Sequence, residues 1–171
     1  MKKTASSMQN DAGPEPDQAL QRAAALCSRQ EQCSSHIREK LRQWGMEEKQ
    51  AEEILARLKS ENFLDDGRYA RFFARDKFRF NHWGKLKIAF QLRQKGVGEE
   101  DIQQACGEID PEAYFESCLK LLQQKSRKLT DMKAFIRRGK LFRFAAGKGF
   151  ESDIIHRAID RLDTFEERRE S

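Results

Sequence analysis

The sequence has no set of residues that would mark a catalytic or metal site. Its three histidines, His36, His82 and His156, have no second metal ligand at helical spacing. There is no phosphate-binding Walker loop, and Gly96-Val97-Gly98 lacks the rest of a dinucleotide-binding fingerprint. The adjacent carboxylates Asp65-Asp66 are more typical of a helix start, where acidic side chains cap the helix and complement its dipole. We therefore expect no enzyme activity, no catalytic residue, no metal and no cofactor.

The sequence also has no long apolar run and no closely spaced cysteine pair. No stretch approaches the ~20 apolar residues of a membrane helix. No apolar segment follows Met1-Lys2-Lys3, as it would in a signal peptide. These absences predict a cytoplasmic protein with reduced thiols and no membrane partner. None of the cysteines has metal-binding spacing; they are Cys27, Cys33, Cys106 and Cys118.

Apolar residues are scarce and charged residues are abundant. Apolar residues make up 38% of the 171 residues and charged residues 36%, against roughly 25% charged in a typical globular protein. No segment shows sustained strand-like alternation, because Phe78 and Phe80 form too short a pattern. A low apolar share fits an elongated stack of small units, since each unit buries only the faces toward its neighbours.

One helix-ending turn occurs three times, at offsets of 51 and 53 residues. In each copy, two apolar residues one turn apart precede a glycine and one further apolar residue. The glycine suits the left-handed residue that ends a helix. The apolar residue after it can contact the preceding helix or the start of the next one. The copies are Ile37, Leu41, Gly45, Met46; Ile88, Leu92, Gly96, Val97; and Leu141, Ala145, Gly149, Phe150.

Each turn is followed by apolar residues in the same register, so the sequence predicts tandem helical repeats. Cys106 occupies the position of Leu55 and Ile159 in the other copies, and we expect it to be buried as a small apolar side chain. The three apolar ladders are Ala51, Ile54, Leu55, Leu58; Ile102, Ala105, Cys106, Ile109; and Ile155, Ala158, Ile159, Leu162.

We expect an all-α fold of three tandem three-helix repeats that forms an elongated, curved stack. The expected parts are a disordered N-terminal arm at 1–16, repeats at 17–64, 65–109 and 110–163, and a charged C-terminal tail at 164–171. Capping residues and helical periodicity predict where the helices begin. The expected starts are Asp17, Ser34 and Glu47; Asp65, Gly84 and Glu99; and Asp110-Pro111, Asp131, and Glu151 or Ser152.

Charge is segregated along the chain, although the net charge is only +5. Residues 1–64 carry ten basic and ten acidic side chains, so the first repeat and its arm are neutral. Residues 66–98 carry nine basic against two acidic side chains, and residues 120–148 carry ten against one. Residues 99–119 carry seven acidic side chains and no basic one. The basic blocks therefore fall on the first two helices of repeats two and three.

Two basic blocks at equivalent places favour a basic surface that binds a phosphate backbone or an acidic protein groove. The alternative is that charged helix faces are simply solvated and that opposite blocks neutralise one another. Arginines on such a surface can bind phosphates or carboxylates through two hydrogen bonds. The candidates are Arg68, Arg71, Arg75, Lys77, Arg79, Lys85, Lys87, Arg93, Lys95, Lys133, Arg137, Arg138, Lys140, Arg143 and Lys148.

Aromatic residues crowd the first basic block. They could stack on single-stranded bases, but helical spacing of Phe72 and Phe73 favours packing in the core. Trp83, beside His82 and Gly84, is the one we expect most readily outside the core. The set is Phe72, Phe73, Phe78, Phe80, Trp83 and Phe90.

Several motifs together resemble the RecX family over about residues 19–162. The junction Leu64-Asp65-Asp66-Gly67-Arg68-Tyr69-Ala70 is followed by Gly84-Lys85-Leu86-Lys87-Ile88 and Leu92-Arg93-Gln94-Lys95-Gly96-Val97. In the third unit, Lys140-Leu141-Phe142-Arg143-Phe144 precedes Gly149-Phe150. Two departures concern capping and surface detail: His36-Ile37 follows Ser34 where the family usually has Glu-Leu, and Gln91 replaces a common glutamate.

The resemblance implies a non-catalytic regulator of the RecA recombinase, acting in DNA repair and the SOS response. Its relatives bind the RecA–DNA filament and restrain ATP hydrolysis, strand exchange and promoted self-cleavage of a repressor. Two alternatives stay open: a module that binds single- or double-stranded DNA weakly and without sequence preference, and a scaffold for another acidic partner. We expect a monomer whose contact surface lies on repeats two and three, with the first repeat as a cap or modulator.

Overall fold

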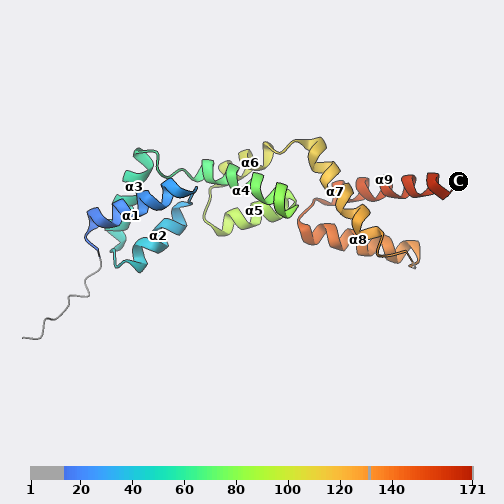
Figure 1. The fold of residues 1–171 in the computed structure, drawn as a ribbon, viewed down its shortest axis with the longest axis horizontal. Helices are drawn as coiled ribbons and strands as arrows, with labels where there is room; N and C mark the ends of the chain where they lie inside the picture. Colours follow the sequence, from blue (N-terminus) through green and yellow to red (C-terminus); the bar gives the residue numbers. More distant parts are fainter. Residues whose placement is uncertain (1–13, 131, 171) are drawn as a thin grey trace, which may run out of the picture. The chain divides into compact units, whose positions relative to one another are not determined.

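A computed structural model describes residues 14–130 and 132–170, which within these ranges form nine helices, connecting turns and no strand (Figure 1). The chain divides into two compact units, Met1–Asp65 and Asp66–Ser171. Three helices lie in the first unit and six in the second. The predicted all-α fold of tandem three-helix repeats is confirmed. No described helix is both long enough and apolar enough to cross a bilayer.

The first unit is a three-helix domain of α1 (Pro16–Arg29), α2 (Ser34–Gln43) and α3 (Glu48–Ser60), each packed on the other two. Its core contains two alanines of α1 together with the predicted apolar ladder of α3. The predicted start at Asp17 is wrong by one residue, because Pro16 already occupies the first turn and its fixed φ suits that position. At the start of α3, the Glu47 backbone N–H donates to Gln50 Oε1 at 2.9 Å.

The second unit contains two further three-helix domains. The helices α4 (Asp66–Asn81), α5 (Lys85–Gln94) and α6 (Glu99–Gly107) pack on one another, and so do α7 (Pro111–Ser126), α8 (Ala134–Lys148) and α9 (Ser152–Glu170). Asp110 caps α7 as predicted, since its Oδ1 accepts from the Ala113 N–H at 2.8 Å. One continuous apolar core runs through all six helices.

Some predicted boundaries fall on residues that the structure does not describe. Residues 1–13 of the expected N-terminal arm lie outside the described residues, and Pro16 already belongs to α1. The expected helix start at Asp131 also lies outside them, and α8 begins at Ala134. Residues 164–170 of the expected tail continue α9. The repeat boundaries themselves stay predictions.

The three predicted glycine turns adopt the expected backbone conformation. Gly45, Gly96 and Gly149 have φ values of 84°, 72° and 92°. After each glycine, the next backbone N–H reaches back to the helix, as in Met46 N–H to Leu41 O at 3.0 Å and Val97 N–H to Leu92 O at 3.1 Å. The apolar residue that follows each glycine is buried. The repeated turn is therefore a Schellman-type helix end that leads into the third helix of each domain.

Two glycines bring the second and third domains into backbone contact. The Gly84 N–H donates to Lys148 O at 2.8 Å and the Leu86 N–H donates to Gly149 O at 3.0 Å. A Cβ on Gly84 would overlap the carbonyl group of Gly149, and one on Gly149 would overlap Lys87. No larger residue fits at either position, so the junction itself requires both glycines.

The ladders that follow the turns are buried with one exception. Cys106 is half-buried, contrary to the prediction, because α6 ends at Gly107 and provides no further turn to cover the thiol. Burial nevertheless raises the pKa of the Cys106 thiol above its ordinary value. None of the four cysteines, all within the described residues, forms a disulfide.

Candidate anion-binding surface

Three arginines follow one face of α4 at intervals of four residues, Arg71, Arg75 and Arg79, and we call them the α4 arginine row. Successive members are about 6 Å apart along the helix axis. They line a groove of about 280 Å³ together with residues from α6 and the start of α7. The row is the most regular array of cationic side chains among the predicted residues.

Two arginines of the row, Arg75 and Arg79, are available for a ligand. Arg75 and Arg79 are exposed, and no carboxylate of the described residues lies within ion-pair distance of either. Arg71 is half-buried, and its Nε lies 3.9 Å from Glu108 Oε1. Arg68, a turn earlier, is half-buried as well. Free guanidinium groups at regular spacing suit an extended polyanion.

Three predicted lysines lie over two aromatic rings beside α4 and α5, and we call this set the lysine–aromatic cluster. Lys87 Nζ is 4.6 Å and Lys77 Nζ 5.8 Å from the centroid of Trp83. Lys77 and Lys95 also lie over Phe73, at 5.5 and 5.9 Å. Cation–π attraction favours these positions, and Lys77 Nζ also lies 3.2 Å from Asp76 Oδ2. The sequence placed the lysines and aromatics in one region but did not show that they contact one another.

The aromatic residues of the first basic block divide between core and surface. Phe73 and Phe78 are half-buried against the core, as core packing predicts. Trp83 is half-buried there too, so the prediction that it lies outside the core is wrong. For Phe72 and Phe80 the prediction is wrong, since they are 54% and 77% exposed; Phe90 is exposed too. Ala70 and Ala74 form the buried side of α4. Phe72 lies midway between them in sequence, so its side chain is on the opposite, outward side of the helix.

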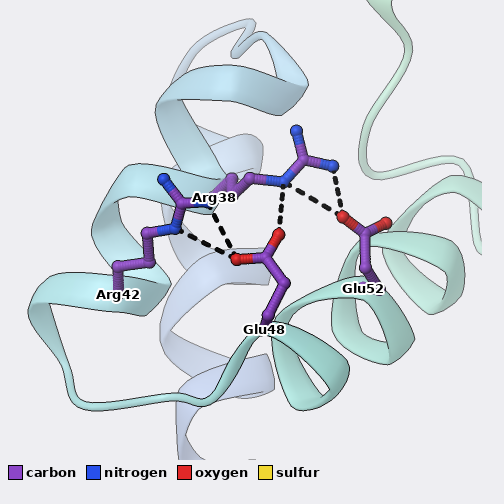
Figure 2. Close-up of polar contacts among 4 residues, drawn as sticks. All are labelled: Arg38, Arg42, Glu48 and Glu52. Atoms are coloured by element: carbon purple, nitrogen blue, oxygen red, sulfur yellow. Dashed lines mark hydrogen bonds and ion pairs between the residues drawn. The ribbon is translucent and has the colours of Figure 1, made fainter.

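Arg93 is bound to a neighbouring carboxylate. Its Nη2 lies 2.7 Å from Glu99 Oε1, and this pairing lowers the pKa of the Glu99 carboxyl. The first domain has the same pair 51 residues earlier, Arg42 with Glu48 at 2.8 Å. Figure 2 shows that pair beside Arg38, whose Nη2 lies 2.5 Å from Glu52. The Arg93–Glu99 ion pair therefore links the end of α5 to the start of α6. Because Arg93 already has this partner, it is not free for a ligand.

Lys85 also has a structural environment. Its Nζ lies 4.9 Å from the centroid of the Tyr114 ring. Its backbone N–H donates to Tyr114 Oη at 2.8 Å, and that hydroxyl donates to Glu151 Oε2 at 2.5 Å. Burial, followed by the bond to Glu151, raises the pKa of Tyr114. These contacts place Lys85 at the junction of the two domains, away from the other lysines named above.

On α8, two of the predicted arginines are paired with α9. Arg137 Nη2 lies 3.3 Å from Asp163 Oδ1. Arg138 Nη2 lies 2.6 Å from Asp160 Oδ1, and Arg138 Nη1 also contacts Asp163 Oδ2. The hydrogen bond to Asp160 is the main cause that raises the pKa of Arg138. The sequence did not reveal these partners, because they lie 22 to 26 residues away on another helix.

The other four predicted cations of the third domain are not paired in this way. Lys133 and Arg143 are exposed and Lys140 and Lys148 are half-buried. No described carboxylate lies within ion-pair distance of any of the four. Among the described residues, two arginines on α4 and these four on or beside α8 thus have no carboxylate partner, and we call them the open cations.

The chain is a helical-repeat protein, because it consists of three consecutive three-helix domains. The open cations lie on the second and third of these domains. Family models match each domain in turn: the first three-helix domain of RecX over residues 19–58, the second over 65–105 and the third over 112–159. The chain belongs to the RecX family.

Relatives of known sequence agree with this assignment. A regulatory protein RecX of Clostridium botulinum (strain Eklund 17B / Type B) is 36% identical over 132 residues, 76% of this chain and 61% of that protein. One of Prosthecochloris aestuarii is 34% identical over 146 residues, 85% of this chain and 94% of that protein. The chain thus spans about three fifths of the Clostridium relative's length. These relatives are named as regulatory proteins.

Two solved structures share the fold. A crystal structure of a regulatory protein RecX matches with a TM-score of 0.78 at 30% identity, covering 85% of this chain and 71% of that one. RecX from Lactobacillus salivarius matches with a TM-score of 0.81 over 87% of this chain and 97% of that one. Its identity is 21%, so this second likeness bears on the fold alone.

Proposed function

We propose that this chain is a non-catalytic cytoplasmic regulator that binds the RecA–DNA filament as a monomer and restrains its ATP hydrolysis, strand exchange and coprotease activities. Membership of the RecX family supports this function. The structural observation that carries it is the pair of exposed arginines, Arg75 and Arg79, on the α4 arginine row. In the same domain, Lys77 and Lys87 lie over aromatic rings.

The open cations divide into two sets on successive domains. One set comprises Arg75 and Arg79 on α4, and the other comprises Lys133, Lys140, Arg143 and Lys148 on or beside α8. A filament repeats the same acidic and phosphate groups along its length, so a protein with two cationic sets can contact it more than once. Linked contacts add through effective concentration. A ligand that binds one filament state more tightly shifts the balance between growth and loss.

The second candidate is direct, sequence-nonspecific binding to DNA by the same cations. Exposed arginines at regular intervals contact phosphates without reading bases. Phosphate binding weakens linearly in log salt, with a slope of roughly −0.7 to −0.9 per phosphate contacted. Contacts between the chain and the recombinase protein release no counterions from DNA, so they weaken less as the salt concentration rises. The two functions therefore differ in their response to salt.

A salt titration of binding separates the two functions. A labelled single-stranded oligonucleotide is presented alone or coated with recombinase and a non-hydrolysable ATP analogue, and binding of the chain is measured by co-sedimentation. Filament regulation predicts that the chain stays on the coated strand at salt concentrations that release it from the bare strand. Equal release from both would contradict the proposal and favour the DNA-binding module.

A further inference from the structure

Residues of α8 and α9 line an apolar groove at the surface of the third domain. The groove has a volume of about 530 Å³, with Phe142 and Ile159 in its lining. Phe135 is 88% exposed and Ile136 is 47% exposed, and both line it. We call it the α8 groove. Contiguous apolar surface of this kind marks an interaction site more often than scattered apolar side chains do.

Gly139 lies in the middle of this apolar stripe, one turn after Phe135. Glycine inside a helix costs about 0.5–1 kcal/mol relative to alanine. The fold does not require it here, because a Cβ at this position would approach nothing closer than Arg143 Nη1 at 4.0 Å. The absent side chain leaves a notch between Phe135 and Phe142 in which a partner side chain can be placed.

Cations flank one side of the groove: Arg143 belongs to its lining, and Lys133 and Lys140 lie outside the lining on the same side of α8. Lys133, Lys140 and Arg143 share a side of α8 with Ile136, at spacings of three, seven and ten residues from Lys133. None of the three has a described carboxylate within ion-pair distance. Arg138, also in the lining, is already neutralised by Asp160 and Asp163. The groove therefore combines an apolar floor with flanking cations that no carboxylate of the described residues neutralises.

We propose that the α8 groove binds an acidic amphipathic helix of a partner protein. The stripe from Phe135 to Arg143 covers about 12 Å of α8, the length of roughly two helical turns. A helix with apolar side chains at i, i+3 or i+4, and i+7 would cover Phe135 and Ile136, and its carboxylates would face the flanking cations. A phosphate backbone would leave both apolar side chains in water, so the groove favours a protein segment over nucleic acid.

A designed peptide tests this site without any recombinase, so its failure is separate from failure of the proposed function. The probe is a fluorescein-labelled 15-residue peptide with leucines repeating at three- and four-residue intervals and glutamates at the helical positions that flank the leucine face. Two control peptides have the same composition in shuffled order, or lysine in place of glutamate. Fluorescence anisotropy of the full chain should rise and saturate with the probe alone. Equal binding of either control peptide, or no binding of the probe, overturns the proposal.

Filling the notch gives a variant that leaves the fold intact. Gly139→Leu adds a side chain where the structure has open space and should weaken probe binding at least tenfold. Gly147→Leu, also within α8 and with nothing within 4 Å, is the matched control and should bind as the unmodified chain does. Circular dichroism checks that both variants stay helical. Equal affinity of the two variants contradicts the proposed site.

Truncating the exposed phenylalanine is the complementary test. Phe135→Ala should also reduce probe binding about tenfold, whereas Phe80→Ala on α4, another exposed phenylalanine, should not. Sedimentation equilibrium and binding of a single-stranded oligonucleotide identify other occupants. If the chain forms a dimer that Phe135→Ala abolishes, the groove binds a second copy of the chain. If it binds the oligonucleotide and Phe135→Ala abolishes that binding, the groove binds nucleic acid. Either result would overturn the proposal.

Discussion

Tyr114 connects three elements of the second unit through its hydroxyl group. The hydroxyl accepts from the Lys85 N–H at the start of α5 and donates to Glu151 just before α9. The ring packs against Phe78 and Phe150, with centroid distances of 5.8 and 5.0 Å. Tyr114 is 2% exposed, so removal of its hydroxyl leaves the Lys85 N–H and the Glu151 carboxylate without their buried partner.

We expect Tyr114→Phe to lower the free energy of unfolding by about 1–3 kcal/mol at neutral pH, since Lys85 and Glu151 lose a buried partner. Glu151→Gln, which keeps an acceptor, should cost less. In the unfolded chain a tyrosine releases its proton near pH 10, whereas the raised pKa keeps Tyr114 protonated in the fold. Stability contributed by Tyr114 therefore falls as pH rises above about 10. In urea unfolding, the difference in free energy of unfolding between the unmodified chain and Tyr114→Phe should become smaller above about pH 10. A difference that stays constant with pH would contradict this prediction.

Gly149 and Gly147 lie two residues apart and should respond oppositely to alanine. Gly149 has a φ of 92° and faces Lys87, so Gly149→Ala should cost at least about 1–3 kcal/mol from strain alone. Gly147 lies within α8 with open space around it, and Gly147→Ala should add about 0.5–1 kcal/mol. Thermal unfolding of both variants measures the difference. A stable Gly149→Ala protein would show that the junction of the two domains tolerates rearrangement.

At the scale of the element, α8 is fixed to α9 by one carboxylate shared between two arginines. Asp163 contacts both Arg137 and Arg138, and its side chain is 29% exposed. We expect Asp163→Ala to lower the free energy of unfolding by roughly 1 kcal/mol, after discounting for partial exposure. Arg143→Ala, which breaks no described ion pair, should leave urea unfolding unchanged. Equal losses in both variants would show that charge alone, and not the pairing, matters.

The elements themselves could be predicted because local spacing determines them. The left-handed glycine and the apolar residue after it, as in Gly45 and Met46, need no information from elsewhere in the chain. The roles of the cations could not be predicted in the same way. Asp163 lies 26 residues from Arg137 and is brought to it only by the packing of α8 on α9. The prediction that Phe72 packs in the core is wrong because Ala70 and Ala74 already form the buried side of α4. Which side of a helix is buried depends on the helices packed against it, and local spacing does not show this.

At the scale of the whole molecule, each compact unit has its own apolar core and its own tryptophan. Trp44 packs against the first core and Trp83 against the second. We expect Leu55→Ala to destabilise the first unit by about 2–5 kcal/mol. In a Trp83→Phe background, the fluorescence of Trp44 should report this shift in urea. In a Trp44→Phe background, Trp83 should report an unchanged midpoint; identical shifts would show that the two units unfold together.

The central claim is that the open arginines of α4 allow this chain to restrain a recombinase filament. The most direct measurement is the rate of ATP hydrolysis by the recombinase on single-stranded DNA. The unmodified chain should lower that rate at stoichiometric amounts, and Arg75→Glu with Arg79→Glu should largely restore it. Arg22→Glu with Lys49→Glu, two exposed residues of the neutral first unit, makes the same charge change and should still inhibit. An unchanged rate with the unmodified chain, or equal inhibition by both variants, would contradict the claim.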